Sequence, residues 1–174
     1  MKGKLILNLA MSLDGYICDL EGGYAWITGD GSKVVDDPQF NFEQFVKQID
    51  MVVMGKRCYE QGMHLEFTDK EVLIATSQPL CDQSANVIGM SGQKLLETVC
   101  RLRDEGKQIY LYGGGVTADL FIKQNLIDEW IIGIIPIILG KGRKLFLGDN
   151  PTLPLKLVAL SSSEGIVLMK YQRR

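Results

Sequence analysis

The strongest chemical signal in the sequence is a run of three glycines, Gly113, Gly114 and Gly115, between two apolar segments. Residues 109–112 before it are β-branched, aromatic or aliphatic and too few for a helix, which predicts a buried strand. After the glycines, apolar residues recur at helical spacing. A helix that follows bare backbone presents unpaired N–H groups and a partial positive charge, which together suit a phosphate. The alternative is a flexible turn that binds nothing.

A second glycine follows a short apolar segment, residues 51–54, and two cations come directly after it. The order is Gly55, Lys56, Arg57. Paired cations at the carboxyl end of a strand suit a phosphate or an acidic substrate. Solvated side chains at the start of a helix are the alternative, although the helix dipole disfavours cations there.

A third predicted strand, residues 71–76, ends in Ser77 and Gln78. A dinucleotide site of the Rossmann kind needs an acidic residue here to bind the ribose hydroxyls of NAD. Hydroxyl and amide side chains, with cations nearby, tolerate a 2′-phosphate instead. The sequence therefore favours NADP over NAD.

Asp14 and Gly15 follow the first predicted strand, residues 4–11. Ligands of open α/β sheets bind beyond the carboxyl ends of strands, so Asp14 is a candidate for polarising or hydrogen-bonding a substrate. A tight Asp-Gly turn is the alternative. Residues 18–38 predict a long loop, in which Trp26 is a candidate to line a pocket or, alternatively, to plug the edge of the core.

These residues require a scaffold that brings several strand ends together. Helices alternate with strands up to residue 125, which is typical of a largely parallel sheet with helices on both faces. The last two strands follow one another without a helix and must pair antiparallel. The predicted strands are residues 4–11, 51–54, 71–76, 86–90, 109–112, 129–138, 155–160 and 165–172. The predicted helices are residues 39–49, 91–105 and 116–124, with another after residue 55.

Composition limits the class of protein. The 174 residues are 46% hydrophobic and 23% charged, with a formal net charge of -2, which predicts one globular domain spanning residues 1–174. The sequence has no block of like charges of the kind that binds nucleic acid, and it has no apolar run long enough for a membrane helix. Four cysteines and one histidine are too scattered for a metal site or a disulfide framework, which predicts reduced thiols and a cytoplasmic protein.

Taken in order, the segments LNLAMSLDG, VVMGKRCYE, TSQ, YLYGGGVTADLF and IIPIILGKGRKLF resemble the dihydrofolate reductase superfamily over nearly the whole chain. They are most similar to small bacterial proteins related to the reductase (RibD C-terminal) domain of riboflavin biosynthesis. The resemblance implies a three-layer α/β sandwich with a mixed, mostly parallel sheet of about eight strands, helices on both faces and an antiparallel C-terminal hairpin. It also implies NADPH as hydride donor and a pteridine-like or pyrimidine-like acceptor.

The resemblance further implies roles for single residues on the cofactor. Those expected against the nicotinamide are Ala10 and Gly15. Those expected at the pyrophosphate and adenosine are Gly55, Lys56, Arg57 and Cys58, with Ser77 and Gln78 near the 2′-phosphate. Those expected to cradle the pyrophosphate are Gly113, Gly114, Gly115, Val116 and Thr117.

Two positions depart from the family's pattern. Cys58 stands where the family commonly has a threonine, and a thiol is a poorer hydrogen-bond partner for phosphate. The acid that holds the pterin in dihydrofolate reductases falls near Asn41, with Glu43 two residues away. Asn41 and Glu43 therefore join Asp14 and Trp26 as candidates for the substrate site.

Three functions remain open at this level. The first is an NADPH-dependent reductase of a pteridine-like or pyrimidine-like molecule. The second is a reductase of the riboflavin pathway's ribosylamino-pyrimidine, whose phosphate would need Arg57, Lys141, Arg143 or Lys144. The third is a non-catalytic dinucleotide-binding protein. In each case we expect a homodimer, as relatives are often dimeric, with the apolar residues 131–138 as a segment that could pair the subunits.

Overall fold

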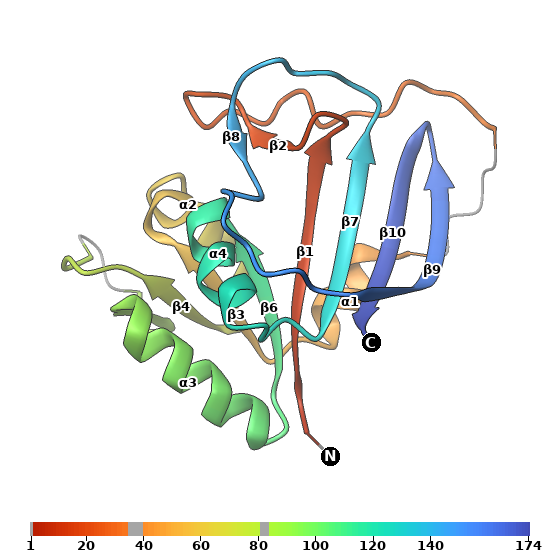
Figure 1. Cartoon of the computed structure of the whole chain (residues 1–174). Coiled ribbons are helices and arrows are strands. Elements are labelled where there is room, and N and C mark those ends of the chain that lie inside the picture. The colour runs from red at the N-terminus through yellow and green to blue at the C-terminus, as the bar shows by residue number, and fades with distance from the viewer. Residues whose placement is uncertain (1, 35–39, 81–83) are drawn as a thin grey trace.

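An eight-stranded sheet forms the centre of the computed structural model, which describes residues 2–34, 40–80 and 84–174 (Figure 1). The strand order is β5-β4-β3-β6-β1-β7-β10-β9. The bounds are β1 (Lys4–Ser12), β3 (Met51–Gly55), β4 (Glu71–Ala75), β5 (Val87–Met90), β6 (Gln108–Gly113), β7 (Glu129–Ile135), β9 (Leu155–Ser163) and β10 (Ile166–Arg173).

The first six strands across the sheet, from β5 to β7, pair in parallel, and β10 pairs antiparallel with both β7 and β9. The predicted mixed sheet with an antiparallel C-terminal hairpin is therefore confirmed. Because the parallel strands run the same way, the carboxyl ends of β1, β3 and β6 lie side by side (Figure 1). Open α/β sheets bind their ligands beyond these carboxyl ends.

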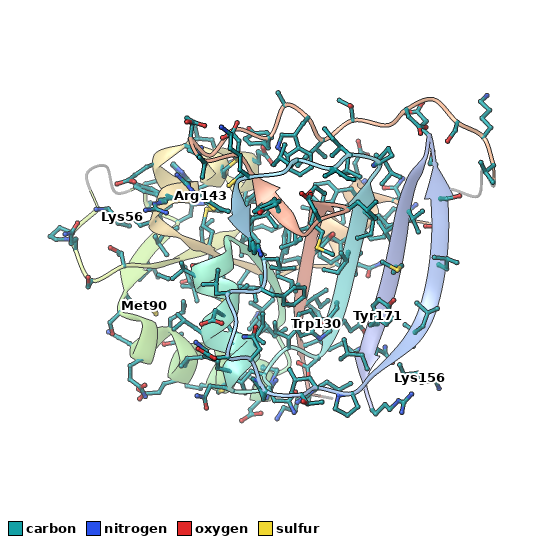
Figure 2. All side chains as sticks on the ribbon, turned by 45° about the horizontal axis from the view of Figure 1, so that its top comes forward. Lys56, Met90, Trp130, Arg143, Lys156 and Tyr171 are labelled. Atoms are coloured by element: carbon teal, nitrogen blue, oxygen red, sulfur yellow. The ribbon has the colours of Figure 1, made fainter. Side chains whose placement is uncertain are left out.

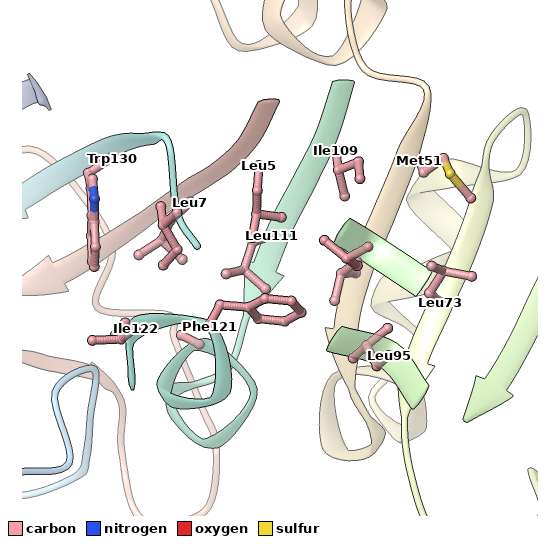
Figure 3. Packing of buried hydrophobic residues seen from close by; sticks show 14 of the residues in the cluster. Leu5, Leu7, Met51, Leu73, Leu95, Ile109, Leu111, Phe121, Ile122 and Trp130 are labelled. Atoms are coloured by element: carbon pink, nitrogen blue, oxygen red, sulfur yellow. The ribbon is translucent and has the colours of Figure 1, made fainter. Parts of the chain in front are cut away.

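Helices cover both faces of the sheet, so the expected three-layer sandwich is confirmed. On one face, α3 (Gly92–Asp104) and α4 (Gly115–Lys123) pack against the strands. Figure 3 shows Phe121 of α4 against Leu111 of β6, near Leu5 of β1, and Leu95 of α3 on the side of Leu73 of β4. The other face carries α1 (Phe42–Lys47), α2 (Lys56–Glu60) and a 3-10 turn, η1 (Met63–Phe67).

Two predicted elements are longer than those observed. The helix expected at residues 39–49 begins at Phe42 and ends at Lys47, and Gln39 lies outside the described residues. The strand expected at residues 129–138 ends at Ile135, because Pro136 has no N–H to donate to the ladder.

The position of β7 also corrects the expectation that residues 131–138 pair subunits. Strand β7 lies between β1 and β10, and Ile131 and Ile132 are buried. Only a strand at the edge of a sheet has free backbone groups with which to pair another chain. The edges of this sheet are β5 and β9, so a sheet-extending dimer would have to use one of them.

A two-stranded ribbon that the sequence did not predict lies beside the main sheet. It pairs β2 (Tyr16–Cys18) with β8 (Arg143–Lys144). Strand β2 ends at Cys18, the first residue of the expected loop 18–38. In the part of the chain that the structure describes, no helix has the length and apolarity to cross a bilayer.

Candidate active site

A cleft of about 950 Å³ opens where β1, β3 and β6 end. It is bordered by the starts of α2 and α4, by the β2–β8 ribbon and by η1. Its lining is mostly apolar, with a few polar and charged groups, as is usual for a site that binds an organic molecule. Of the residues proposed from the sequence for the cofactor, those in the lining are Ala10, Gly55, Lys56, Arg57, Cys58, Gly114, Gly115, Val116 and Thr117.

The glycine run forms the wall of the cleft at the start of α4. Gly114 is the N-cap of this helix, and no side chain caps the first N–H groups. A Cβ at Gly114 would make only an ordinary van der Waals contact, 3.7 Å from Ile17 Cδ1, so this bare backbone is not enclosed by packed side chains, and it lines the cleft. A Cβ at Gly115 would lie 2.3 Å from the Lys144 carbonyl oxygen, so this glycine is required for β8 to pack. Gly113 lies outside the lining and is joined to Gly114 by a cis peptide bond.

Four cations line the cleft: Lys56, Arg57, Arg143 and Lys144. Figure 2 shows Lys56 and Arg143 on the same side of the molecule. Lys56 Nζ donates to Gln78 Oε1 at 2.6 Å, which places Gln78 beside the cleft although neither it nor Ser77 is part of the lining. Unpaired N–H groups at α4 and four positive side chains fit a diphosphate with an additional phosphate, as NADPH carries.

Cys58, which stands where the resemblance leads us to expect a threonine, also lines the cleft. Burial raises the pKa of its thiol, and a hydrogen bond from the Gly114 N–H only partly offsets this. The sulfur is therefore neutral at neutral pH, and it packs as a small apolar group. Cys18, Cys58 and Cys100 are free thiols, and Cys81 lies outside the described residues.

Asp14 and Gly15 lie outside the lining of the cleft. The Asp14 carboxylate accepts hydrogen bonds from Ser12 Oγ at 2.6 Å and from the N–H groups of Leu139 and Gly140 at 3.0 and 2.8 Å. These bonds, Ser12 first, lower the pKa of Asp14 from 3.8 to about 2. The geometry supports the tight-turn alternative, in which Asp14 ties two loops together, rather than contact with a substrate.

The other substrate candidates also lie outside the lining. Asn41 is the N-cap of α1, where its side chain accepts from the Gln44 N–H, and Glu43 is exposed in the first turn of the same helix. Trp26 is half-buried, while Tyr24 and Ile27 on either side of it do reach the cleft. The loop prediction thus identified the correct segment but not its contacting residues.

The sequence did not predict the far end of the cleft. There the lining comes from α1, from η1 and from the face of the sheet that these two elements cover. Tyr110 and Tyr112 from β6 and Phe42 from α1 form an aromatic wall. Asn8 from β1 and Glu66 from η1 are the polar groups beside it. A signal for Asn8 existed, because it is the only polar residue within residues 5–11, an otherwise apolar run.

Burial fixes the protonation of both phenols. It raises the pKa of Tyr110 and of Tyr112 far above the usual value, and the nearby Glu66 carboxylate raises both further. Tyr110 donates to the Asn8 carbonyl oxygen at 3.1 Å, and Tyr112 donates to Met63 Sδ at 3.2 Å. Both rings therefore remain neutral hydroxyl donors at neutral pH.

Known structures share this fold over nearly the full chain. A Shewanella sp. PV-4 protein, provisionally named as a riboflavin biosynthesis protein, is 26% identical with a TM-score of 0.81, covering 98% of this chain and 99% of its own. A Thermotoga maritima diaminohydroxyphosphoribosylaminopyrimidine deaminase/5-amino-6-(5-phosphoribosylamino)uracil reductase is 18% identical with a TM-score of 0.70. This chain corresponds to 57% of the Thermotoga protein's length.

Comparisons of the sequence give the family assignment through a domain profile. The uncharacterized Bacillus subtilis (strain 168) proteins YyaP and YwjB are each 29% identical, and the matches cover 97% and 99% of this chain and 94% and 99% of theirs. The profile of the RibD C-terminal domain matches residues 59–168, which is more than half of the 174 residues. The chain therefore belongs to the RibD C-terminal domain family, as the resemblance in its glycine and strand-end motifs predicted.

Proposed function

We propose that this protein is an NADPH-dependent reductase that transfers hydride to a pteridine-like or pyrimidine-like small molecule. One observation carries the proposal. The uncapped start of α4, with the bare backbone of Gly114, opens into a cleft of about 950 Å³ that four cations line. The same cleft continues over an apolar and aromatic surface large enough for a second, flat molecule.

Each end of the cleft has a distinct task in this proposal. The N–H groups at the start of α4, with Lys56 and Arg57, bind the phosphates and so fix the cofactor's position. Ala10 of β1, whose small side chain faces the cleft, leaves room for a flat ring. NADPH, when bound, supplies the hydride, while the protein orients the reactants and excludes water.

Charge in the cleft favours an acceptor without a phosphate. The three phosphates of NADPH carry roughly three to four negative charges, and the four lining cations, of which Lys56 also pairs with Glu60 at 3.5 Å, offset most of this charge. Within the described lining, Glu66 is the only carboxylate, and it lies beside Tyr112 at the aromatic end. A negative group there repels an anionic acceptor and attracts amino substituents of a heterocycle.

The phosphorylated pyrimidine named in the Thermotoga relative is the second candidate acceptor. Three of the four basic residues expected to bind its phosphate, Arg57, Arg143 and Lys144, line the cleft, whereas Lys141 does not. Arg143 already donates to the Leu20 carbonyl oxygen at 2.8 Å but keeps further N–H groups.

A kinetic comparison tests the proposal. Purified protein is mixed with NADPH and either 7,8-dihydrofolate, 5-amino-6-(5-phosphoribosylamino)uracil or its unphosphorylated form, 5-amino-6-(ribosylamino)uracil, and NADPH absorbance is followed. We expect turnover with an unphosphorylated heterocycle. Turnover of the phosphorylated pyrimidine alone would select the second candidate. Tight NADPH binding without oxidation across this panel and a wider set of imines and carbonyls would favour the third possibility, a dinucleotide-binding protein. As part of the proposal we expect a cytoplasmic homodimer.

A further inference from the structure

Asn8 is a buried polar side chain whose amide nitrogen has no partner. The residue is 7% exposed, it lies on β1 between β6 and β7, and it lines the cleft. Its Nδ2 is buried and makes no hydrogen bond to any described residue. An amide N–H that is withdrawn from water without a partner costs free energy, and such groups in native proteins are almost always paired. The residue lines the cleft, and rotation of its amide about χ2 turns the enclosed Nδ2 toward that cleft, where a ligand can supply the missing acceptor.

The surroundings hold Asn8 in one place. Its backbone is in the middle of the parallel sheet, opposite Ile131 of β7. Its carbonyl oxygen accepts the Tyr110 hydroxyl at 3.1 Å. The Tyr110 ring is itself held edge-on by Phe45, with the ring centroids 5.0 Å apart and the planes at 80°. A polar group on such a rigid base is suited to select a ligand by hydrogen bonding, since little freedom is lost on binding.

Asn8 lies where we expect the hydride acceptor to bind, rather than where we expect the phosphates of the cofactor. Alternate residues of a strand face the same side of the sheet, so Asn8 shares its face with Ala10, which also lines the cleft. The aromatic side chain of Tyr110 lies on this face too. By contrast, the start of α4, where phosphate is expected, packs on the opposite face with Phe121 and Ala118.

We propose that Asn8 is a specificity residue that donates a hydrogen bond from Nδ2 to a carbonyl oxygen of the hydride acceptor. The acceptor is thus a lactam-bearing heterocycle. A neutral amide on the same wall as the Glu66 carboxylate suits a neutral carbonyl and not a phosphate or carboxylate group. This inference deepens the proposed reductase function and rests on it.

The test compares two pairs of probes that differ in ring carbonyl groups. One pair is pterin and 2-aminopteridine, and the other is 5,6-diaminouracil and 4,5-diaminopyrimidine. Binding is measured by calorimetry with and without NADP⁺, for the wild type, for Asn8→Leu and for Trp130→Phe. The last variant is the matched control, because Trp130 Nε1 is another buried unpaired N–H but lies outside the cleft lining.

We expect the wild type and Trp130→Phe to bind the carbonyl member of at least one pair about 5- to 100-fold more tightly than its partner. In Asn8→Leu this preference should fall to within about twofold, while the thermal midpoint stays at or above the wild-type value because an unpaired polar group is removed. NADP⁺ affinity should not change.

Three results would overturn the inference. The first is that the wild type prefers neither member of either pair, and the second is that the carbonyl preference persists in Asn8→Leu. The third is that Asn8→Leu loses folding rather than specificity, which would mean that an internal contact or a water satisfies Nδ2. Failure to bind NADP⁺ would contradict the proposed reductase instead, and the titrations without NADP⁺ would still decide the role of Asn8.

Discussion

A Cβ atom on Gly55 would lie 2.7 Å from Thr117 Oγ1. This closeness ties together two segments that are far apart in sequence, the end of β3 and the first turn of α4. Both segments line the cleft, and Thr117 is buried. The glycine that ends β3 therefore lets α4 approach, and the position of the α4 backbone that we propose binds phosphate depends on it.

Gly55→Ala should consequently weaken both folding and cofactor binding. Adding a methyl group into a packed contact costs typically about 1–3 kcal/mol, and we expect a loss of this size in urea unfolding. NADPH affinity, followed by fluorescence, should fall because α4 must shift. Removing the contacted oxygen in Gly55→Ala/Thr117→Ala should recover part of the stability, and equal stability of the single and double variants would show that this contact is not the cause.

Lys56 should decide the preference for NADPH over NADH. It lines the cleft and donates to Gln78, the residue expected near the 2′-phosphate. We expect Lys56→Gln to raise the Kd for NADPH about 3- to 30-fold, with the Kd for NADH unchanged. Lys94→Gln, an exposed lysine on α3 away from the cleft, serves as the control. An equal loss for both cofactors would place the 2′-phosphate elsewhere.

Asp14 should contribute stability that depends on pH in acid. Its pKa is lowered on folding from 3.8 to about 2, so the ionised form is favoured in the folded state. The contribution is complete above the unfolded value of 3.8 and disappears as the pH falls through about 2. Wild type should therefore exceed Asp14→Asn in urea unfolding free energy at neutral pH, and the difference should shrink in this acid range. A stability difference that does not change with pH would mean that the hydrogen bonds of the Asp14 side chain to residues 139–140 do not depend on its charge.

The edge strand β9 is the surface on which we expect the homodimer to form. It lies at the end of the sheet and leaves Leu157 and Leu160 49% and 56% exposed, on the side where no other strand of the described chain pairs with it. Light scattering should give a mass of about twice the 19.4 kDa of one chain. Leu160→Glu should shift it toward the single-chain mass, whereas Leu65→Glu, an exposed apolar residue on η1, which packs against α2 and β4 at the other side of the sheet, should not. A single-chain mass for the wild type would contradict the dimer.

Local pattern was sufficient for the fold wherever burial dominates. Strand β6 and helix α4 were predicted because an apolar run, a glycine break and helical spacing are all local signals. The β2–β8 ribbon was not, because Arg143 and Lys144 are polar and form a strand only by pairing with β2, close to Gly115. Such a contact between distant segments leaves no periodic trace in the sequence.

The candidate site also combines features that local sequence could predict with features that it could not. Backbone features at strand ends, such as Gly114, could be predicted because their function needs only the absence of a side chain. The contacts of side chains could not. The sequence cannot show that the Asp14 carboxylate turns toward residues 139–140, nor that Asn8 and Glu66, 58 positions apart, both reach one cleft.

The central claim is that the bare backbone at Gly114 binds the phosphates of NADPH, and Gly114→Asp tests it most directly. Aspartate is a favourable N-cap, and the φ of -74° at Gly114 is open to any residue, so α4 should persist. The carboxylate would nonetheless lie where phosphate is expected. We predict that the Kd for NADPH, measured by fluorescence titration, rises about 10- to 100-fold in Gly114→Asp and clearly less in the neutral Gly114→Asn. A folded Gly114→Asp protein that binds NADPH as tightly as the wild type would contradict the account.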